Sequence, residues 1–399
     1  MVTRHPAPAY QDLFRHRAHS LHDHHRPGAV HFTWNARGAL FQLLTTLPAR
    51  TGGMILVPAF HCIALVKPIL AAGFELGFYR IRTDLTIDVD DLAAQLHSEV
   101  AAVLVIHYFG FPADLDGVLP LVRARGALLI EDCSHAFLTR DRGGVLGHQG
   151  DYAVFSYYKC APSGIGGALV ANGGTSLPTA QGARVPWPVQ LAVIRRWLME
   201  ADARRPKRGM QILHRALAAL SRRGLTQRGQ PAGGGNPRTA SGAPLRGFLD
   251  DPYLFDLSLA RAGLPWYARR IVESSPWDEI ALARRRNYAA LSRLIPDSEV
   301  LRRLIPDLPD GVVPYMFPVY LRNRRHHEQA LREAGVPLLR FGETLHHELE
   351  GAGESARTDA EDLSGSLLLL PVHQDLDPQQ IGRYVARLLE YVAGIPSKC

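Results

Sequence analysis

The sequence is short of cysteine and of long apolar runs. Its 399 residues include four cysteines, which lack paired spacing: Cys62, Cys133, Cys160 and Cys399. This usage argues against a disulfide framework and against a structural zinc site. The longest apolar runs, 100–106 and 367–372, are too short to cross a bilayer. The first thirty residues hold no apolar stretch of the kind that a secretory signal needs. We therefore expect a soluble, cytoplasmic globular protein.

Lysine is scarce as well, although the chain is basic. Only four of the 45 basic residues are lysines: Lys67, Lys159, Lys207 and Lys398. Segment 195–246 alone carries a net charge of about +10, whereas the whole chain carries +7. One interpretation is an arginine-rich helix and loop inserted in a nearly neutral protein. The other is a patch that meets a phosphorylated substrate, an acidic carrier protein or nucleic acid. Nucleic acid is the weakest of these, because no zinc-finger spacing or aromatic RNA-binding signature accompanies the patch.

Apolar residues are abundant: they make up 46% of the sequence, whereas charged residues make up 21%. This composition suits a protein with a large folded core. Between residues 54 and 171, short apolar runs alternate with amphipathic stretches of about ten residues. This pattern predicts strands near 54–57, 75–81, 101–107 and 127–130, joined by helices, in a parallel sheet with right-handed crossovers. Beyond residue 277, the pattern predicts a long helix at 277–294 and then a smaller α+β unit. We predict an α/β fold with a large domain at 1–290, an insertion at about 173–252 and a small domain at 291–399.

Two residues far apart in the sequence carry the chemistry. Asp132 falls where a buried parallel strand ends, which is where open α/β sheets place their ligands. A carboxylate there needs a positive partner, and a protonated pyridine nitrogen would fit. Lys159 enters a turn at the end of a later strand. A desolvated amine beside a cationic ring is a competent Schiff-base former. The pair predicts a site that holds one aromatic cofactor between an ammonium group and a carboxylate.

Other residues around these strand ends offer weaker signals. The small residues of 34–40, with Arg37 and Gly38, begin an apolar helix whose backbone N–H groups could hold a phosphate. Ser156 could add a hydroxyl to the same phosphate. Phe60 and His61 follow another strand and could stack on a cofactor, while packing is an equally good interpretation of Phe60.

Together these motifs resemble those of the DegT–StrS family of sugar aminotransferases, which use pyridoxal 5′-phosphate (PLP). Residues 57–60 (VPAF) resemble the strand end of that family, and 107–110 (HYFG) resemble its H-x-(Y)-G motif. Residues 131–136 (EDCSHA) resemble its E-D-x-x-(Q/H)-A motif, and 371–373 (PVH) its C-terminal segment. Gly147-x-x-Gly150-Asp151 precedes the lysine strand as in the family.

The resemblance implies a PLP-dependent transferase of fold type I, with no metal ion and with a homodimer as the assembly. Lys159 would form the Schiff base with PLP, Asp132 would hold the pyridinium nitrogen, and His135 would contact the ring hydroxyl. Ser156 and the backbone of Arg37 and Gly38 would hold the phosphate, and Phe60 and His61 would line the cofactor. The implied reaction moves an amino group from an amino acid to a keto acceptor, with a nucleotide-linked ketosugar as the leading acceptor.

The sequence departs from the common family pattern in two places. Ser156 and Lys159 are three apart, whereas the usual motif is F-S-F-x-x-x-K, so the chain resembles a divergent branch with S-x-x-K. The usual Asn-Tyr-Arg segment, which reaches the phosphate of the neighbouring protomer, is not recognisable in 250–261. Three alternatives stay open. One is a PLP enzyme that acts on an amino acid or a natural-product intermediate. The others are a nucleotide-binding α/β protein without PLP and a catalytically idle binding partner.

Overall fold

The fold was analysed in a computed structural model. It describes residues 6–9, 12, 15, 25, 29–47, 53–142, 144–177, 183–204, 255–346, 349 and 352–395. Most of the arginine-rich segment at 195–246 lies outside the described residues.

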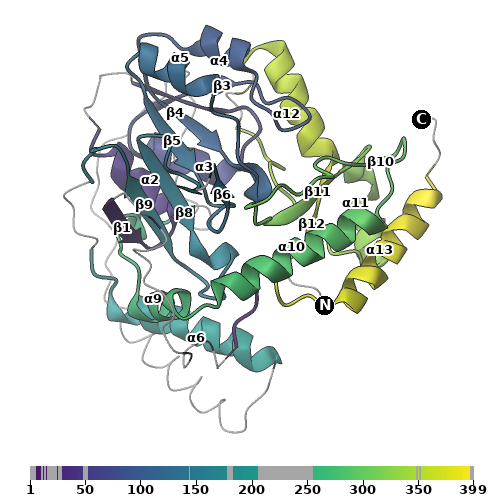
Figure 1. The fold of residues 1–399 in the computed structure, drawn as a ribbon. Helices are drawn as coiled ribbons and strands as arrows, with labels where there is room; N and C mark the ends of the chain where they lie inside the picture. The colour runs from purple at the N-terminus through teal and green to yellow at the C-terminus, as the bar shows by residue number, and fades with distance from the viewer. Residues whose placement is uncertain are drawn as a thin grey trace.

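A seven-stranded sheet forms the centre of the structure (Figure 1). Its order is β1-β9-β8-β5-β4-β2-β3. The strands are β1 (Ala29–Thr33), β2 (Met54–Pro58), β3 (Glu75–Tyr79), β4 (Val100–Ile106), β5 (Leu128–Asp132), β8 (Tyr152–Ser156) and β9 (Gly167–Ala171). The five strands from β8 to β3 are parallel, whereas β9 pairs antiparallel with both β8 and β1. The predicted parallel sheet is therefore confirmed at its centre, and one edge is antiparallel.

Helices and short turns connect these strands in the order that the apolar pattern predicts. They are α2 (Ala36–Leu44), α3 (Ile63–Ala71), α4 (Val89–Gln95), η2 (Tyr108–Gly110), α5 (Val118–Ala124) and η3 (Tyr157–Lys159). Gly73 and Gly126 follow α3 and α5 with φ of 89° and 64°. Glycine is favoured at both positions because it adopts left-handed backbone without steric cost. A two-stranded hairpin, β6 (Arg140–Asp141) and β7 (Gly144–Val145), lies between β5 and β8.

A second, antiparallel sheet has the order β10-β11-β12. Its strands are β10 (Leu301–Arg303), β11 (Met316–Leu321) and β12 (Leu367–Pro371), and its helices are α11 (Arg324–Glu333), α12 (Glu354–Ser366) and α13 (Pro378–Ala393). The long helix α10 (Trp277–Leu294) runs from the large sheet to this small one (Figure 1). The predicted domain boundary at residue 290 falls inside α10 and stays a prediction.

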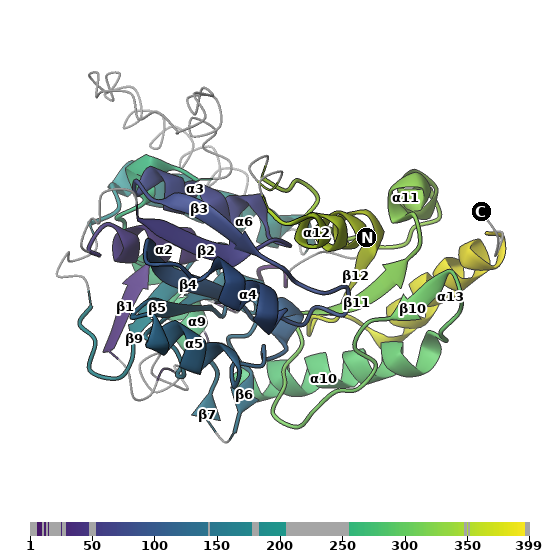
Figure 2. The same cartoon turned by 90° about the horizontal axis from the view of Figure 1, so that it is seen from above.

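The remaining described elements are α6 (Trp187–Arg204), η4 (Leu257–Leu259) and α9 (Trp266–Glu273). Figure 2 shows α6 and α9 on the large-sheet side of the molecule, and α11, β10 and α13 on the other side.

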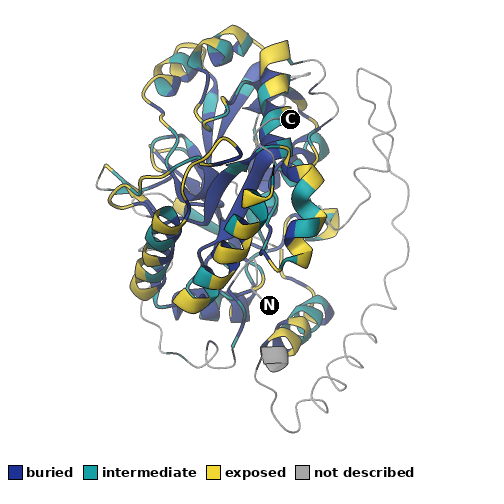
Figure 3. Cartoon of the chain, turned by 90° about the vertical axis from the view of Figure 1, so that its right-hand side faces the viewer, coloured by how far each residue is buried: buried dark blue, intermediate teal, exposed yellow. Residues whose placement is uncertain are grey.

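Two apolar cores stabilise the two sheets. The larger core surrounds β2, β4 and β5, and β4 is an almost continuous apolar run because both faces of this strand are buried. The smaller core joins α10, α13 and the small sheet. Figure 3 shows buried strands beneath helices whose outer faces are exposed. Among the described helices, none combines the length and apolar character needed to span a membrane.

Candidate active site

The strand register brings the chemically active residues to one edge of the large sheet. Asp132 ends β5, and it is paired in register with Val154 of the neighbouring parallel strand β8. Ser156 ends β8, and Lys159 ends the 3-10 turn that follows directly. The carboxyl ends of parallel strands form the ligand-binding edge of an open α/β sheet. Residues that are far apart in sequence therefore lie at the same edge of the sheet.

The Asp132 carboxylate is half-buried and has one local partner. Its Oδ1 accepts a hydrogen bond of 2.8 Å from the backbone N–H of Ser134. Burial raises the pKa of the neighbouring Tyr108 hydroxyl, and the charges of Tyr79 and Asp132 raise it further. Burial likewise raises the pKa of Cys133, with added contributions from Glu131 and Asp132. The Tyr108 hydroxyl and the Cys133 thiol therefore stay neutral.

His135 lies inside a stack of aromatic rings. Its ring lies nearly parallel to that of Tyr315, with centroids 4.6 Å apart, and it also stacks with the ring of Phe109 at 5.6 Å. Its Nδ1 accepts a hydrogen bond of 3.4 Å from the backbone N–H of Phe109, which adopts a left-handed φ of 55°. Nδ1 is thus an acceptor, so a neutral His135 carries its proton on Nε2.

Lys159 is half-buried and lies against the same stack. Its Nζ lies 5.5 Å from the centroid of the Tyr315 ring, a distance at which a cation is attracted to an aromatic face. Tyr315 belongs to the segment that leads into β11, and its N–H donates a hydrogen bond of 2.6 Å to the carbonyl of Phe109. Sequence analysis missed Tyr315, because nothing in its local pattern indicates contact with the lysine.

The start of α2 packs directly against the strand that pairs with Ser156. A Cβ added to Gly167 would lie 2.5 Å from the carbonyl carbon of Asn35 and 2.6 Å from the nitrogen of Ala36. Gly167 is the register partner of Ser156. Because Gly167 lacks a side chain, the positive end of the helix dipole can approach the Ser156 hydroxyl.

The cap of α2 changes the part predicted for Gly38. Its backbone N–H donates a hydrogen bond of 2.8 Å to the side chain of Asn35, the N-cap residue. This N–H group is therefore already engaged, and Gly38 serves packing, since its Cβ would lie 3.0 Å from the carbonyl oxygen of Ala260. Arg37 is half-buried in the first turn of α2.

Phe60 and His61 are fully buried, and their observed partners are protein groups. The Phe60 ring packs against Phe341, with centroids 5.3 Å apart. The Nδ1 of His61 lies 2.9 Å from the carbonyl oxygen of Ala59, and its Nε2 accepts a hydrogen bond of 3.3 Å from the N–H of His346. Burial lowers the pKa of His61 to about 4. Both residues pack against protein groups near this edge of the sheet, and their predicted contact with a cofactor stays a prediction.

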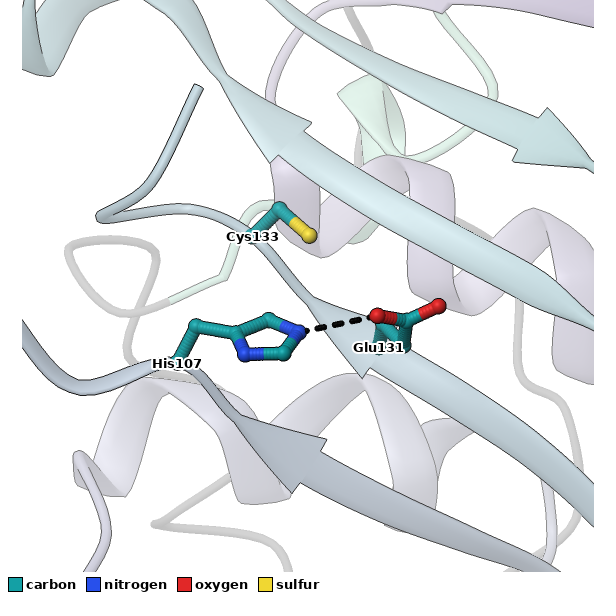
Figure 4. Close-up of side chains that lie close together, drawn as sticks. All are labelled: His107, Glu131 and Cys133. Atoms are coloured by element: carbon teal, nitrogen blue, oxygen red, sulfur yellow. Dashed lines mark hydrogen bonds and ion pairs between the residues drawn. The ribbon is translucent and has the colours of Figure 1, made fainter. Parts of the chain in front are cut away.

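A buried pair beneath the site ties two strands together. Within the described residues, His107, Glu131 and Cys133 have side-chain atoms within 4.8 Å of one another (Figure 4). The Nε2 of His107 donates to Glu131 at 3.0 Å, and its Nδ1 accepts from the N–H of Ala113 at 3.0 Å. Both ring nitrogens are engaged, so the geometry favours a structural bridge over a metal site.

The chemistry of these residues suits PLP. The site offers a lysine amine, a carboxylate on the neighbouring strand and a helix N-terminus beside a serine hydroxyl. A pyridinium nitrogen requires the carboxylate, an aldehyde requires the amine, and a phosphate requires the N–H groups and hydroxyl.

Comparison with known proteins adds independent information. The profile of the DegT/DnrJ/EryC1/StrS aminotransferase family matches residues 18–181. GDP-perosamine synthase from Vibrio cholerae is 31% identical over 141 residues, which are 35% of this chain and 38% of that protein. UDP-N-acetyl-3-dehydro-α-D-glucosamine 3-aminotransferase from Acidithiobacillus ferrooxidans is 29% identical over 157 residues, 36% of this chain and 40% of that protein. The matches thus span about two fifths of the length of these curated relatives.

A solved structure extends the likeness of fold to most of the chain. PseC of Helicobacter pylori, an aminotransferase involved in the biosynthesis of pseudoaminic acid, has a TM-score of 0.65 at 15% sequence identity. The superposition covers 94% of this chain and 90% of PseC. The predicted α/β fold with a mostly parallel central sheet is confirmed, and it is shared with this aminotransferase. Residues 18–181 of the chain are therefore similar to the DegT/DnrJ/EryC1/StrS aminotransferase family.

Proposed function

We propose that this protein is a PLP-dependent aminotransferase that moves an amino group from an amino acid to a keto acceptor. The proposal is supported by the position of Asp132 at the carboxyl end of β5 and of Lys159 in the turn that follows the adjacent parallel strand β8. Bound PLP would supply an electron sink for the carbanion that forms when an amino acid loses its α-proton.

The residues of the chain would divide the remaining work. The Asp132 carboxylate would keep the pyridine nitrogen protonated, because a half-buried anion favours a cation beside it. Lys159 would bind the cofactor aldehyde through Nζ. Its amine would also serve as the general base and acid that takes up and returns the α-proton of the amino donor. His135, held by its stack, would donate from Nε2 to the ring hydroxyl.

The phosphate of PLP would lie between Ser156 and the start of α2. The close approach at Gly167 supports this position, since it leaves the helix N-terminus beside the serine. The backbone of Arg37 would contribute there. The Gly38 N–H would contribute only where the phosphate displaces the Asn35 cap.

For the keto acceptor we propose a nucleotide-linked ketosugar, because the curated relatives are named for nucleotide-sugar amination. We also propose a homodimer, a cytoplasmic location and a division into a large domain at 1–290 and a small one at 291–399. These parts of the proposal rest on family resemblance.

The test is spectral and chemical. Purified protein incubated with PLP should develop the visible band of a Schiff base, and borohydride should fix PLP to Lys159, as peptide mass spectrometry would record. Lys159→Ala should lose both signals, and Asp132→Asn should retain PLP but slow transamination by orders of magnitude. Lys398→Ala is the matched control, because it removes one of the other three lysines. A wild-type protein that fixes no PLP at Lys159 would end the proposal.

The acceptor is tested separately. After a donor such as glutamate bleaches the band, a panel of nucleotide-linked ketosugars should restore it. If a donor bleaches the band and every ketosugar fails, the sugar acceptor is wrong while PLP chemistry stands. Restoration by a keto acid or a natural-product ketone would then favour the alternative substrate class.

A further inference from the structure

Arg284, a residue of helix α10, is buried against the lysine turn. It is 1% exposed, and within the described residues its hydrogen bonds go to backbone carbonyl oxygens. Its Nη2 donates to the carbonyl of Lys159 at 2.8 Å. Its Nη1 donates to the carbonyls of Pro314 at 3.2 Å and Tyr315 at 3.4 Å. One guanidinium therefore joins the backbone of the lysine to the backbone of the tyrosine whose ring lies under its amine.

The burial of the Arg284 guanidinium adds little to the stability of the core. The Nε of Arg284 is buried without a hydrogen-bond partner among the described residues. Burying a charge is costly unless its donors are satisfied, and an apolar residue of similar size would cost less. A buried arginine whose Nε lacks a hydrogen-bond partner therefore indicates a functional role at this position. Its other donors fix the geometry of the lysine turn.

The ring of Tyr315 supplies the second contact. One face of the ring lies parallel to His135, with centroids 4.6 Å apart, and Nζ of Lys159 lies 5.5 Å from its centroid. A lysine side chain loses rotamer entropy when it is ordered, so a support that already restricts it lowers the cost of bringing the amine to a reaction partner.

We propose that Arg284 and Tyr315 are positioning residues for the Lys159 amine. Arg284 holds the lysine turn and the Tyr315 segment at a constant separation, and the Tyr315 ring supports Nζ. The S-x-x-K spacing places Lys159 at the end of a single 3-10 turn directly after β8. Contacts from another element, such as those of Arg284, can therefore fix the position of this short turn. The inference deepens the proposed function, since it rests on Lys159 as the group that binds PLP.

The first experiment measures how fast PLP becomes trapped on Lys159. The wild-type and variant proteins are mixed with PLP, reduced with borohydride at timed intervals, and analysed by peptide mass spectrometry. Arg284→Met and Tyr315→Leu should slow trapping at Lys159 by roughly tenfold, as expected for the loss of one charge-assisted contact. Tyr315→Phe keeps the ring and should react as the wild type does.

The matched control is the next residue of the same helix. Arg285 also ties α10 to backbone carbonyls, but its Nη1 donates to Pro309 at 2.8 Å and Val312 at 2.7 Å, which lie outside the lysine turn. Arg285→Met should leave the rate of trapping unchanged. If Arg285→Met slows trapping as much as Arg284→Met does, the effect comes from general loosening of α10 and the inference is overturned.

The second experiment needs no cofactor. Acetic anhydride labels lysine amines, and Lys67 serves as an internal control because it is fully buried. Arg284→Met and Tyr315→Leu should increase labelling of Lys159 by roughly tenfold, since the released amine moves into solvent, while labelling of Lys67 stays constant. A parallel rise at Lys67 would reveal partial unfolding and count against the inference.

The two experiments separate the two claims. Wild-type protein that traps PLP on Lys159, together with variants that trap it equally fast, would overturn the positioning role and leave the proposed function intact. Wild-type protein that never traps PLP would overturn the proposed function, and the labelling of Lys159 would still decide whether Arg284 and Tyr315 hold the amine.

Discussion

The Nε2 of His107 lies 3.0 Å from Oε2 of Glu131, and both side chains are fully buried. The other carboxylate oxygen, Oε1, accepts hydrogen bonds from the backbone N–H groups of Gln149 at 2.8 Å and Gly150 at 2.6 Å. Glu131 therefore joins the end of β4 to the turn that precedes β8, directly beside Asp132. The pair is a structural basis for the candidate site, and it carries a pH dependence.

For Glu131, we expect acid to remove a stabilising contribution. Burial raises the pKa of this carboxyl, but hydrogen bonds from His107, Gly150 and Gln149 lower it more, so that it lies below its ordinary value of 4.5. The stabilisation is complete above pH 4.5 and is lost as the pH falls through the lower folded pKa. Glu131→Gln should lower the free energy of unfolding by about 2 kcal/mol at neutral pH. It should also reduce the decline of that free energy in acid, as measured by urea unfolding at a series of pH values.

The control for Glu131 is an exposed carboxylate. Asp116 also has a basic partner, with Nη2 of Arg142 at 2.7 Å, but both side chains are largely in solvent. Asp116→Asn should leave the free energy of unfolding nearly unchanged. Equal changes in the free energy of unfolding for Glu131→Gln and Asp116→Asn would contradict the inference that burial makes the His107–Glu131 pair stabilising.

Because His61 is buried, we expect a second decrease in the free energy of unfolding in acid. Burial lowers its pKa to about 4, against 6.5 when it is exposed. The unfolded chain therefore binds a proton more tightly than the folded chain, so stability falls as the pH drops from 6.5 to 4 and is unaffected above this window. The shift corresponds to about 3 kcal/mol. His61→Asn keeps a donor near Nδ1 and should flatten the profile within that window.

An exposed histidine tests whether burial is the cause. His97 lies on the surface, and His97→Asn should leave the dependence of unfolding free energy on pH as in the wild type. A profile for His61→Asn that still falls between pH 6.5 and 4 by the wild-type amount would show that other groups carry the effect.

Gly167→Ala should disturb both folding and cofactor binding. The new Cβ would lie 2.5 Å from the Asn35 carbonyl carbon, so β9 and the start of α2 must separate. Overpacking of this kind costs about 1–3 kcal/mol. PLP affinity, followed by fluorescence quenching, should fall with it. Gly382→Ala in α13 meets no atom within 4 Å and serves as control, and it should leave both quantities near the wild-type level.

Asn35→Asp separates helix capping from phosphate binding. Aspartate is as good an N-cap as asparagine and suits the helix dipole, so the free energy of unfolding should stay within about 0.5 kcal/mol of the wild type. A carboxylate beside the proposed phosphate position should weaken PLP binding by at least about tenfold through repulsion. Measured PLP affinity equal to the wild type would place the phosphate elsewhere.

The cap of α13 provides the comparison for Asn35. The side chain of Asp377 accepts a hydrogen bond of 2.8 Å from the N–H of Gln379, in a helix outside the large sheet. Asp377→Ala should cost about 1 kcal/mol of stability without any change in PLP affinity. We therefore expect Asn35→Asp to change PLP affinity alone and Asp377→Ala to change the free energy of unfolding alone.

Periodicity predicted most elements, and the ones it missed have physical reasons. The helix at 277–294 and the strand at 101–107 have strong patterns, and the structure confirms both within a residue at each end. Helix α12 was missed because its sequence, ESARTDAEDLSGS, offers few apolar positions, and its burial depends on the neighbouring strands. Strand β1 was missed because a five-residue edge strand becomes recognisable only through its antiparallel partner β9.

The amino-acid order alone determined where strands end and therefore that Asp132 and Lys159 reach the same edge of a parallel sheet, because that follows from local periodicity and from the geometry of parallel strands. Only the tertiary structure decided that Tyr315 lies under the lysine amine, that Arg284 holds both backbones, and that Asn35 engages the Gly38 N–H. Contacts between distant segments depend on packing between two sheets and a connecting helix, and side-chain packing of this kind leaves no repeating mark in the local sequence.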